Sequence, residues 1–312
     1  MNALRCNLDR ARWLLVRLAA MASLCLTMAN TKAETECHSV HPFWSPFDNR
    51  IVFFRMCGEH QDVWLVRSDG HDAVQLTHDG KSYLPVWGRN ADEVVFRRKN
   101  GNTDRLILLG LDTGSERVLA SGLDAGLIGA IGVSIPLNSA IVATRVDEQD
   151  VILAIDLDSN SRSMLLDGVA LRGNVATAGG TVLFDYQGDR KGGIGVIKPD
   201  GWAPLFEIED DAFYPQATSG LEKLAYVRMV NENPDAYVYH TSLGEHCMLH
   251  ASIGFDGEAS FAPDQENLVL ISTQSGQAEL MTSSGCDSTA RLLMPDHQSG
   301  GLKTYPSSKR SR

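Results

Sequence analysis

Residues 41–77 read HPFWSPFDNRIVFFRMCGEHQDVWLVRSDGHDAVQLT, and this stretch decides the fold. It contains two apolar runs, IVFF (51–54) and VWLV (63–66), and Asp62 directly precedes the second run. A shorter run, AVQL (73–76), follows the turn RSDGHD. Short β-branched and aromatic runs that are separated by Asp-Gly turns are typical of antiparallel strands joined as hairpins.

The pattern of this stretch recurs along the chain. The IVFF run has counterparts spaced 41 to 47 residues apart, and their matching positions are Ile51, Val94, Ile141, Val182, Leu224 and Leu268. The acid before the next run recurs as Asp62, Asp104, Asp150 and Asp235, with Gly193 and Gln277 in the fourth and sixth copies. The leucine that closes each copy is Leu76, Leu119, Leu165, Leu205, Leu249 or Leu292. A period slightly above forty residues is the length of a propeller blade.

We therefore predict an all-β fold, a six-bladed β-propeller of four-stranded antiparallel blades over residues 34–296. Two β-sandwiches are the alternative, but they require no regular period. The recurring Asp is interpreted as structural, because a carboxylate at the start of a strand can accept backbone N–H groups of the preceding turn. Trp44 and Trp87, on the first strand of their blades, are expected to pack between neighbouring blades.

The first copy resembles the repeat of the TolB-like propeller family, which reads roughly P-x-W-S-P-D-G-x-x-I-A-F, then D-I-Y-x-x-x-x-D-G, then x-x-L-T. The residues that fall on this pattern are Pro42, Trp44, Ser45, Pro46, Asp62, Asp69, Gly70, Leu76 and Thr77. Later copies keep parts of it, and the third and fourth are degenerate. The resemblance covers residues 38 to 296 and implies a six-bladed propeller. TolB also carries an α/β domain ahead of its propeller, whereas only a few residues separate the predicted cleavage site from the first copy here. We therefore expect a bare propeller and carry over no role in a Tol system.

Residues 1–33 are predicted to be a secretory signal peptide. Four arginines precede an apolar run from Leu18 to Ala29, and either Thr27 with Ala29 or Thr31 with Ala33 fits a cleavage site. An uncleaved anchor is the alternative, but a run of about twelve residues is short for a bilayer. We therefore expect a periplasmic or secreted protein with no membrane segment after cleavage. Residues 297–312 are expected to form a C-terminal tail, although TYPSS (304–308) resembles the start of a further unit.

The net charge argues against polyanionic partners. The formal charge is −11, and residues 1–29 hold four Arg and one Asp, so their removal makes it −14. Such an acidic surface argues against nucleic acid and anionic membranes. We expect no cofactor, a monomeric chain and a protein or peptide partner in the cell envelope.

Catalytic and metal-binding motifs have no support in the sequence. The chain has no G-x-S-x-G, H-E-x-x-H or paired C-x-x-C motif. His246 and His250, in HCMLH, would lie on one face of a strand about 13 Å apart, too far to share a metal ion. GDRKGG (188–193) lacks the strand–loop–helix context of a phosphate-binding loop and is interpreted as a turn.

Two classes of function remain open. The first is a non-catalytic, exported scaffold that binds a protein or peptide with the rim or mouth of the propeller. The second is a lyase or hydrolase acting on a polysaccharide or lactone, which needs His, acid and Arg side chains converging from several blades. We favour binding and predict no catalytic or metal residues. The candidate binding residues at the channel mouth are His41, Trp44, Tyr83, Trp87 and Tyr214. Replacing Tyr83 or Tyr214 by Ala is expected to weaken binding more than folding.

Four cysteines remain after residue 33 and allow three pairings. In a propeller, the loops between blades and the turns between second and third strands share one face, which we call the top face. Cys37 and Cys57 are expected at the top face, and Cys247 and Cys286 at the bottom face, in turns between third and fourth strands. We therefore predict the disulfides Cys37–Cys57 and Cys247–Cys286, as an oxidising compartment favours. Four free thiols are the alternative.

Overall fold

The computed structural model describes residues 36–127, 129–188, 192–206, 208, 210–286 and 288–294, and the backbone of residues 303–304. Within these ranges every regular element is a β-strand. The predicted signal peptide and most of the predicted tail lie outside the described residues. In the part of the chain that is described, no helix has the length and apolar character needed to cross a membrane.

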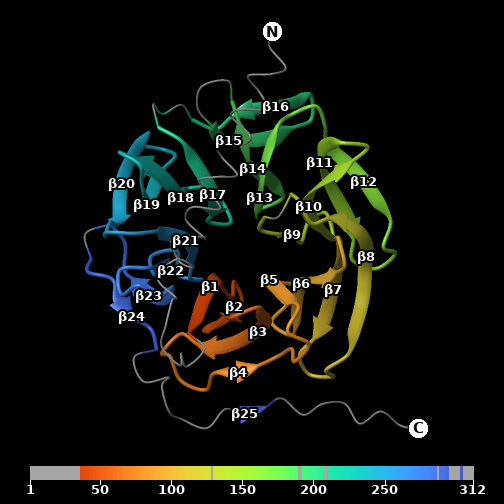
Figure 1. The fold of residues 1–312 in the computed structure, drawn as a ribbon. Helices are drawn as coiled ribbons and strands as arrows, with labels where there is room; N and C mark the ends of the chain where they lie inside the picture. The colour runs from red at the N-terminus through yellow and green to blue at the C-terminus, as the bar shows by residue number, and fades with distance from the viewer. Residues whose placement is uncertain are drawn as a thin grey trace. The chain divides into compact units, whose positions relative to one another are not determined.

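Strands β1–β24 form six four-stranded antiparallel sheets arranged as a ring (Figure 1), which confirms the predicted six-bladed propeller. Each blade is built in sequence order, from an innermost first strand to an outermost fourth strand. Blade 1 comprises β1 (Cys37–Trp44), β2 (Arg50–Cys57), β3 (His60–Arg67) and β4 (Val74–Gln75). Blade 2 comprises β5 (Ser82–Trp87), β6 (Glu93–Asn100), β7 (Thr103–Gly110) and β8 (Glu116–Asp124). Blade 3 comprises β9 (Gly132–Ser134), β10 (Ser139–Val146), β11 (Gln149–Asp156) and β12 (Arg162–Leu166).

Blades 4 to 6 continue in the same order. Blade 4 comprises β13 (Leu171–Ala178), β14 (Thr181–Gln187), β15 (Gly192–Lys198) and β16 (Gly201–Pro204). Blade 5 comprises β17 (Ala212–Ala217), β18 (Lys223–Val230), β19 (Asn233–His240) and β20 (Glu245–His250). Blade 6 comprises β21 (Asp256–Phe261), β22 (Leu268–Ser272), β23 (Glu279–Ser283) and β24 (Arg291–Leu292). The recurring apolar runs are the second strands, and the recurring leucines lie in or beside the fourth strands.

The core is divided among the seams between blades. The described residues contain six buried apolar clusters, one for each pair of neighbouring blades. Trp44 belongs to the cluster between blades 6 and 1, and Trp87, which is 2% exposed, belongs to the cluster between blades 1 and 2. Both tryptophans therefore pack between blades as predicted, and full burial of one such side chain contributes about 1.5–3 kcal/mol or more.

Blades 6 and 1 close the ring without sharing a strand among β1–β24. The Ser39 N–H donates to the Ala278 carbonyl (2.8 Å), and the Trp44 N–H donates to Ser260 Oγ (3.0 Å). Inside the predicted tail, β25 (Lys303–Thr304) pairs in parallel with β4 at the outer edge of blade 1 (Figure 1). A segment after the last blade thus returns to the first blade.

Both predicted disulfides are present. Cys37–Cys57 joins directly paired residues of β1 and β2, with 4.2 Å between Cα atoms. Cys247–Cys286 joins blade 5 to blade 6, with 5.9 Å between Cα atoms, which lies in the usual range. Cys286 lies in the turn after β23, but Cys247 lies within β20 and not in the preceding turn as predicted.

Candidate functional site

The top face is defined by contacts between the loops that join blades and the hairpins beside them. The loop between β4 and β5 accepts the Gln61 N–H at the Gly80 carbonyl and the Lys99 N–H at the Lys81 carbonyl, each at 3.0 Å. This loop therefore touches the hairpin ends of blades 1 and 2. The loops between blades and the turns between second and third strands lie on one face, as predicted.

The innermost strands of five blades are interrupted by β-bulges. Their register with the second strand shifts near the middle of β1, β5, β13, β17 and β21. The residues with positive φ at these bulges are His41 (54°), Leu84 (51°), Gly173 (112°), Tyr214 (54°) and Glu258 (50°). A positive φ is uncommon outside glycine, and bulges and backbone strain are enriched at functional sites. The innermost strands, which surround the centre of the ring in Figure 1, are therefore the candidate site.

His41 and Glu258 meet at the seam between blades 1 and 6. The His41 N–H donates to Glu258 Oε2 at 2.8 Å, and the ring Nδ1 lies 3.7 Å from the same oxygen. The two side chains are 5% and 13% exposed. Both ring nitrogens of His41 are buried and have no hydrogen-bond partner among the described residues. A histidine beside a carboxylate can take up or release a proton, so this pair is the strongest acid–base candidate of the site.

Asp185 ties three blades together on the other side of the ring. Its carboxylate is fully buried and accepts the Asn174 N–H at 2.8 Å and the Tyr214 N–H at 3.3 Å. The Asn174 side chain donates to the same carboxylate and accepts the Ala130 N–H at 3.0 Å. The carboxylate of blade 4 thereby positions the start of blade 5, and Asn174 holds the segment that leads into blade 3. Its role is structural.

Tyr83 is part of a buried polar network and not of an exposed surface. It is 4% exposed, and its hydroxyl donates to Asp104. Arg97 lies 3.4 Å from the same carboxylate and donates to the Ala143 carbonyl of blade 3 at 2.8 Å. Burial and the bond to Asp104 raise the pKa of Tyr83. Replacing Tyr83 by Ala should therefore weaken folding, which revises the prediction made from sequence.

In blades 1 and 3 the recurring Asp of the third strand binds the segment that leads into the next blade, whereas Asp104 of blade 2 binds Tyr83 and lies against Arg97 of its own blade. Asp62 Oδ1 accepts Thr77 Oγ1 at 3.0 Å and the Gly80 N–H at 3.1 Å, and Asp150 accepts the Leu171 N–H at 3.1 Å. The predicted structural role holds, but the predicted donors in the preceding turn are wrong. In these two blades the carboxylate lies where one blade ends and the next begins.

Blade 4 has Gly193 at this position and solves the same problem differently. Arg172, which is buried on β13, pairs with Asp211 in the loop before blade 5 at 2.8 Å. Asp211 also accepts the Gly192 N–H at 2.5 Å. A Cβ at Gly192 would overlap the Arg172 guanidinium, so glycine makes room for this pair. GDRKGG begins directly after β14 and ends inside β15, since Gly192 and Gly193 are the first two residues of that strand; residues 189–191 are outside the described part.

His246 and His250 both lie on β20 and have different partners. His246 Nδ1 is 2.7 Å from the Tyr226 hydroxyl, and burial together with the charge of Arg228 lowers the pKa of His246. His250 Nε2 lies 3.8 Å from the buried Asp256. Within the described residues, three potential metal ligands converge only at His240, Cys247 and Cys286. The two sulfurs there form the disulfide, whereas a metal would require thiolates.

The five predicted binding residues are not gathered on one surface. His41, Trp44, Tyr83 and Trp87 are buried, and Tyr214 is half-buried. His41 and Tyr214 do stand at bulges, on blades 1 and 5. Sequence reasoning missed Glu258, which occupies the position of His41 in the sixth copy, and Arg172. Aligning the bulge positions of all copies would have found Glu258.

Comparison with known proteins establishes the fold. No protein-family model and no curated protein sequence matches this chain. The structure of TolB from Acinetobacter baumannii matches with a TM-score of 0.71 and 16% identity, over 80% of this chain and 64% of that chain. The likeness is one of fold. This chain is a TolB-like six-bladed propeller, as its repeat pattern predicted, and it spans less than two thirds of that TolB.

Two further matches show how widely this fold is used. A putative TolB from Agrobacterium tumefaciens matches with a TM-score of 0.59 and 14% identity, over 75% of this chain and 88% of that chain. Oligogalacturonate lyase from Vibrio parahaemolyticus matches with a TM-score of 0.58 and 12% identity, over 81% of this chain and 92% of that chain. Because an enzyme shares the fold, function has to be argued from the site.

Proposed function

We propose that this chain is an exported, non-catalytic propeller that binds a protein or peptide partner in the cell envelope through its top face. The observation that carries the proposal is how the polar groups near the ring centre are used. Glu258 and Asp185 accept backbone N–H groups from neighbouring blades, and Asp211 pairs with Arg172. These three acids hold the ring together, and we infer that recognition uses the exposed side chains of the top face instead.

Export is supported by the cysteines. Two disulfides are stable in an oxidising compartment and rare in a reducing cytosol. The structural likeness to TolB fits an extracytoplasmic location. Fractionation of the source cells should recover a shortened form in the periplasm or medium. Recovery of the full-length chain from the cytosol would contradict export.

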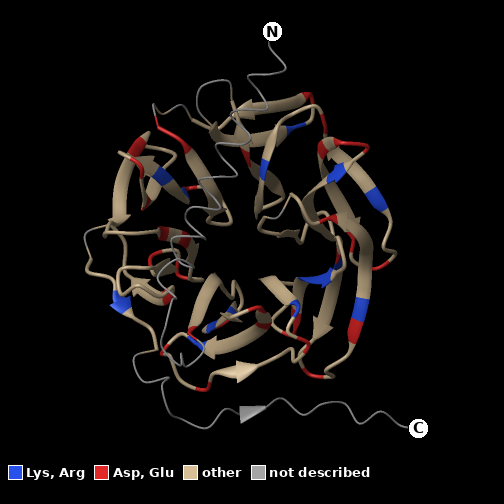
Figure 2. Cartoon of the chain, in the orientation of Figure 1, with Lys and Arg blue, Asp and Glu red and all other residues tan. Residues whose placement is uncertain are grey.

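The top face is acidic among the described residues. Figure 2 shows many Asp and Glu residues in the turns at the strand ends. The exposed acids in the top-face turns and loops are Glu59, Asp79, Asp147, Glu148, Asp167 and Glu232, against the exposed Lys81 and Lys99. Charge of one sign steers partners of the opposite sign and sets their orientation. The partner is therefore proposed to present a basic surface.

A polysaccharide lyase is the second candidate, and one observation favours it. His41 and Glu258 form a buried histidine–carboxylate pair at bulged backbone, and a lyase shares the fold. The test uses the chain from residue 34 with oligogalacturonate, and measures ultraviolet absorbance of the unsaturated product. The binding proposal expects no turnover above that of buffer. Turnover that His41→Ala abolishes, while the melting temperature is kept, would replace it with the lyase.

The same purified chain, immobilised, should capture a specific protein from envelope extract. The matched comparison is a top-face variant, Glu59→Gln with Asp147→Asn and Glu232→Gln, in which Asn keeps the positive φ of position 147. Its control removes three exposed acids of the bottom face, by Asp112→Asn, Asp200→Asn and Glu245→Gln. Capture by the wild type and the control, but not by the top-face variant, supports the proposal. Equal capture by all three would reject the top face.

A further inference from the structure

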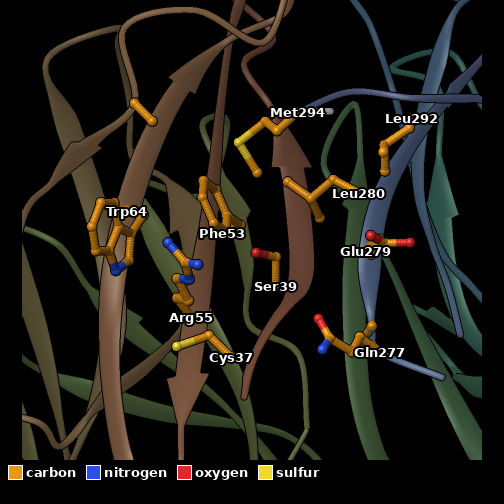
Figure 3. A pocket seen from close by; sticks show the side chains of 12 residues that line it. Cys37, Ser39, Phe53, Arg55, Trp64, Gln277, Glu279, Leu280, Leu292 and Met294 are labelled. Carbon is orange, nitrogen blue, oxygen red and sulfur yellow. The ribbon is translucent and has the colours of Figure 1, made fainter. Parts of the chain in front are cut away.

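A pocket lies at the seam between blades 6 and 1 (Figure 3) and encloses about 120 Å³. Its wall on blade 1 includes Ser39, Arg55 and Trp64, and its wall on blade 6 includes Gln277 and Glu279. One water needs only about 10–15 Å³ of such space, so a small organic group fits. This pocket is separate from the exposed acids of the top face, and the inference from it does not rest on the proposed function.

Arg55 gives the pocket its chemistry. Its guanidinium carbon lies 5.7 Å from the centroid of the Trp64 ring, in a cation–π arrangement. Its Nε is shielded from solvent and has no hydrogen-bond partner in the described part of the chain. Burial lowers the pKa of Arg55, as expected for a cation in a poorly solvated place. The charge therefore faces the pocket without a protein counter-ion among the described residues.

Three other arginines of the same propeller have a carboxylate partner, which Arg55 lacks among the described residues. Arg97, Arg145 and Arg228 each pair with a carboxylate, at distances of 3.4, 2.8 and 2.7 Å. A shielded donor without an acceptor costs about 1–3 kcal/mol, and more when it is charged. Such a group in a folded protein calls for an explanation, and an unfilled binding role is one.

We propose that this pocket binds a carboxylate, with the Arg55 guanidinium as its anchor. The planar guanidinium presents N–H donors in a fork that matches the two oxygens of a carboxylate. In Figure 3 the Gln277 amide points toward blade 1 across the pocket, where it can donate a further hydrogen bond. Apolar lining for a short aliphatic portion of the ligand comes from Phe53, Leu280 and Met294.

Glu279 selects the charge of the ligand. Its carboxylate lines the same pocket and points away from Arg55 in Figure 3. One guanidinium and one carboxylate in the wall leave no surplus of positive charge for a dianion. A monocarboxylate is therefore favoured over phosphate. The carboxylate can belong to a free small acid or to the C-terminus of a peptide, and these two sources are distinguished by the test.

The test is an NMR titration of the ¹⁵N-labelled chain from residue 34, followed at the Trp64 indole and the backbone of β2. The probes are propionate, its neutral analogue propionamide, inorganic phosphate, and acetyl-Gly-Ala with a free or an amidated C-terminus. Propionate is expected to saturate these signals, propionamide to leave them unchanged, and phosphate to bind at least tenfold more weakly. Tighter binding of the free peptide than of propionate, lost on amidation, identifies a C-terminus. Equal binding of propionate and the free peptide identifies a small acid as the ligand.

Variants link the binding to the guanidinium. Arg55→Gln should weaken propionate at least tenfold, whereas Arg105→Gln, at an exposed arginine of β7, should leave it unchanged. Glu279→Gln should strengthen it several-fold. Arg55→Lys keeps the positive charge but loses the paired N–H donors of the guanidinium, so it should weaken propionate binding several-fold. This variant replaces Arg55→Gln in the test if Arg55→Gln fails to fold. Absence of saturation by propionate, or equal affinity in Arg55→Gln and Arg55→Lys and the wild type, would overturn the proposal.

Discussion

Blades 2 and 4 are each attached to the following blade by a buried arginine and an acid, but the two blades supply these residues from different positions. In blade 2 the third strand supplies Asp104, which binds Tyr83 and lies against Arg97, and Arg97 reaches the Ala143 carbonyl of blade 3. In blade 4 the third strand supplies glycine. There the arginine is Arg172, on the first strand, and its acid comes from the following loop.

The difference shows what the propeller requires at each joint and what it leaves free. Each joint needs an acceptor for the backbone N–H groups and cations that a neighbouring blade brings in. Either strand or loop can supply this acceptor. The recurring Asp is thus one common source of this acceptor. In blade 4, which lacks it, the acceptor is Asp211 of the following loop, so we expect this joint to be no weaker.

The largest expected effect is that of Asp104→Ala. Arg97 and Asp104 are both fully buried, and removal of the carboxylate leaves the guanidinium without its counter-ion. Breaking such a buried pair from one side costs about 3–5 kcal/mol. Urea unfolding measures the loss, and Asp112→Ala, at an exposed acid, should change stability by less than about 0.5 kcal/mol. A cost below 1 kcal/mol for Asp104→Ala would break the comparison, because blade 2 would not depend on its acid.

Gly192→Ala tests blade 4. The added methyl group overlaps the Arg172 guanidinium and should disturb its pair with Asp211, at a cost of about 1–3 kcal/mol. The cost should fall by at least about 0.5 kcal/mol in an Arg172→Ala background, because the overlap is then relieved. Additive effects of the two changes in urea unfolding would show that Gly192 does not make room for Arg172.

Asp235 of blade 5 sharpens the comparison with a smaller effect. It keeps the recurring position, and its carboxylate accepts the side chain of Asn233 at 2.5 Å. Burial, and then the neighbouring Asp256, raise the pKa of Asp235. A raised pKa means that the folded state prefers the protonated acid, so this stabilisation is present at low pH and is lost as pH rises through the folded pKa.

Asp235→Asn should therefore raise the melting temperature at pH 7, where the wild-type carboxylate is ionised at a site that disfavours its charge. The gain should shrink as pH falls toward and below the unfolded-state pKa of Asp, about 3.9, because the wild-type acid then becomes protonated in both states. Thermal melts of both proteins between pH 3.5 and pH 7, with Asp112→Asn as the control, measure the difference. A lower melting temperature of Asp235→Asn at pH 7 would show that this acid stabilises its joint as Asp104 does.

The sequence predicted the ring but not its joints. The spacing of the second strands, from Ile51 to Leu268, indicated six blades because each blade repeats the same hairpins. Both disulfides followed, since the topology brings each pair of cysteines to one face. The partners of Asp62 could not be predicted in the same way, because they belong to the following loop and the strand pattern contains no contacts across a seam.

The candidate site was predicted only in part, for a related reason. Tyr83 and Trp87 are of residue types that are common at binding surfaces, but a tyrosine or tryptophan on an innermost strand can equally pack in the seam between two blades. Whether it is buried there depends on the neighbouring blade. Glu258 carries no motif, and Arg55 is recognised as unusual only when its surroundings are known. The net negative charge was visible in the composition, but its distribution over the two faces was not.

The central claim is that the acidic top face binds a basic partner, and its most direct test is the affinity of the captured protein for three forms of this chain. Surface plasmon resonance would compare the wild type, the top-face variant and the bottom-face control at 50 and 300 mM salt. The account predicts at least a tenfold weaker Kd for the top-face variant at low salt, a wild-type affinity that falls as salt screens the charges, and no change in the control. Equal affinities of the wild type and the top-face variant at low salt would contradict it.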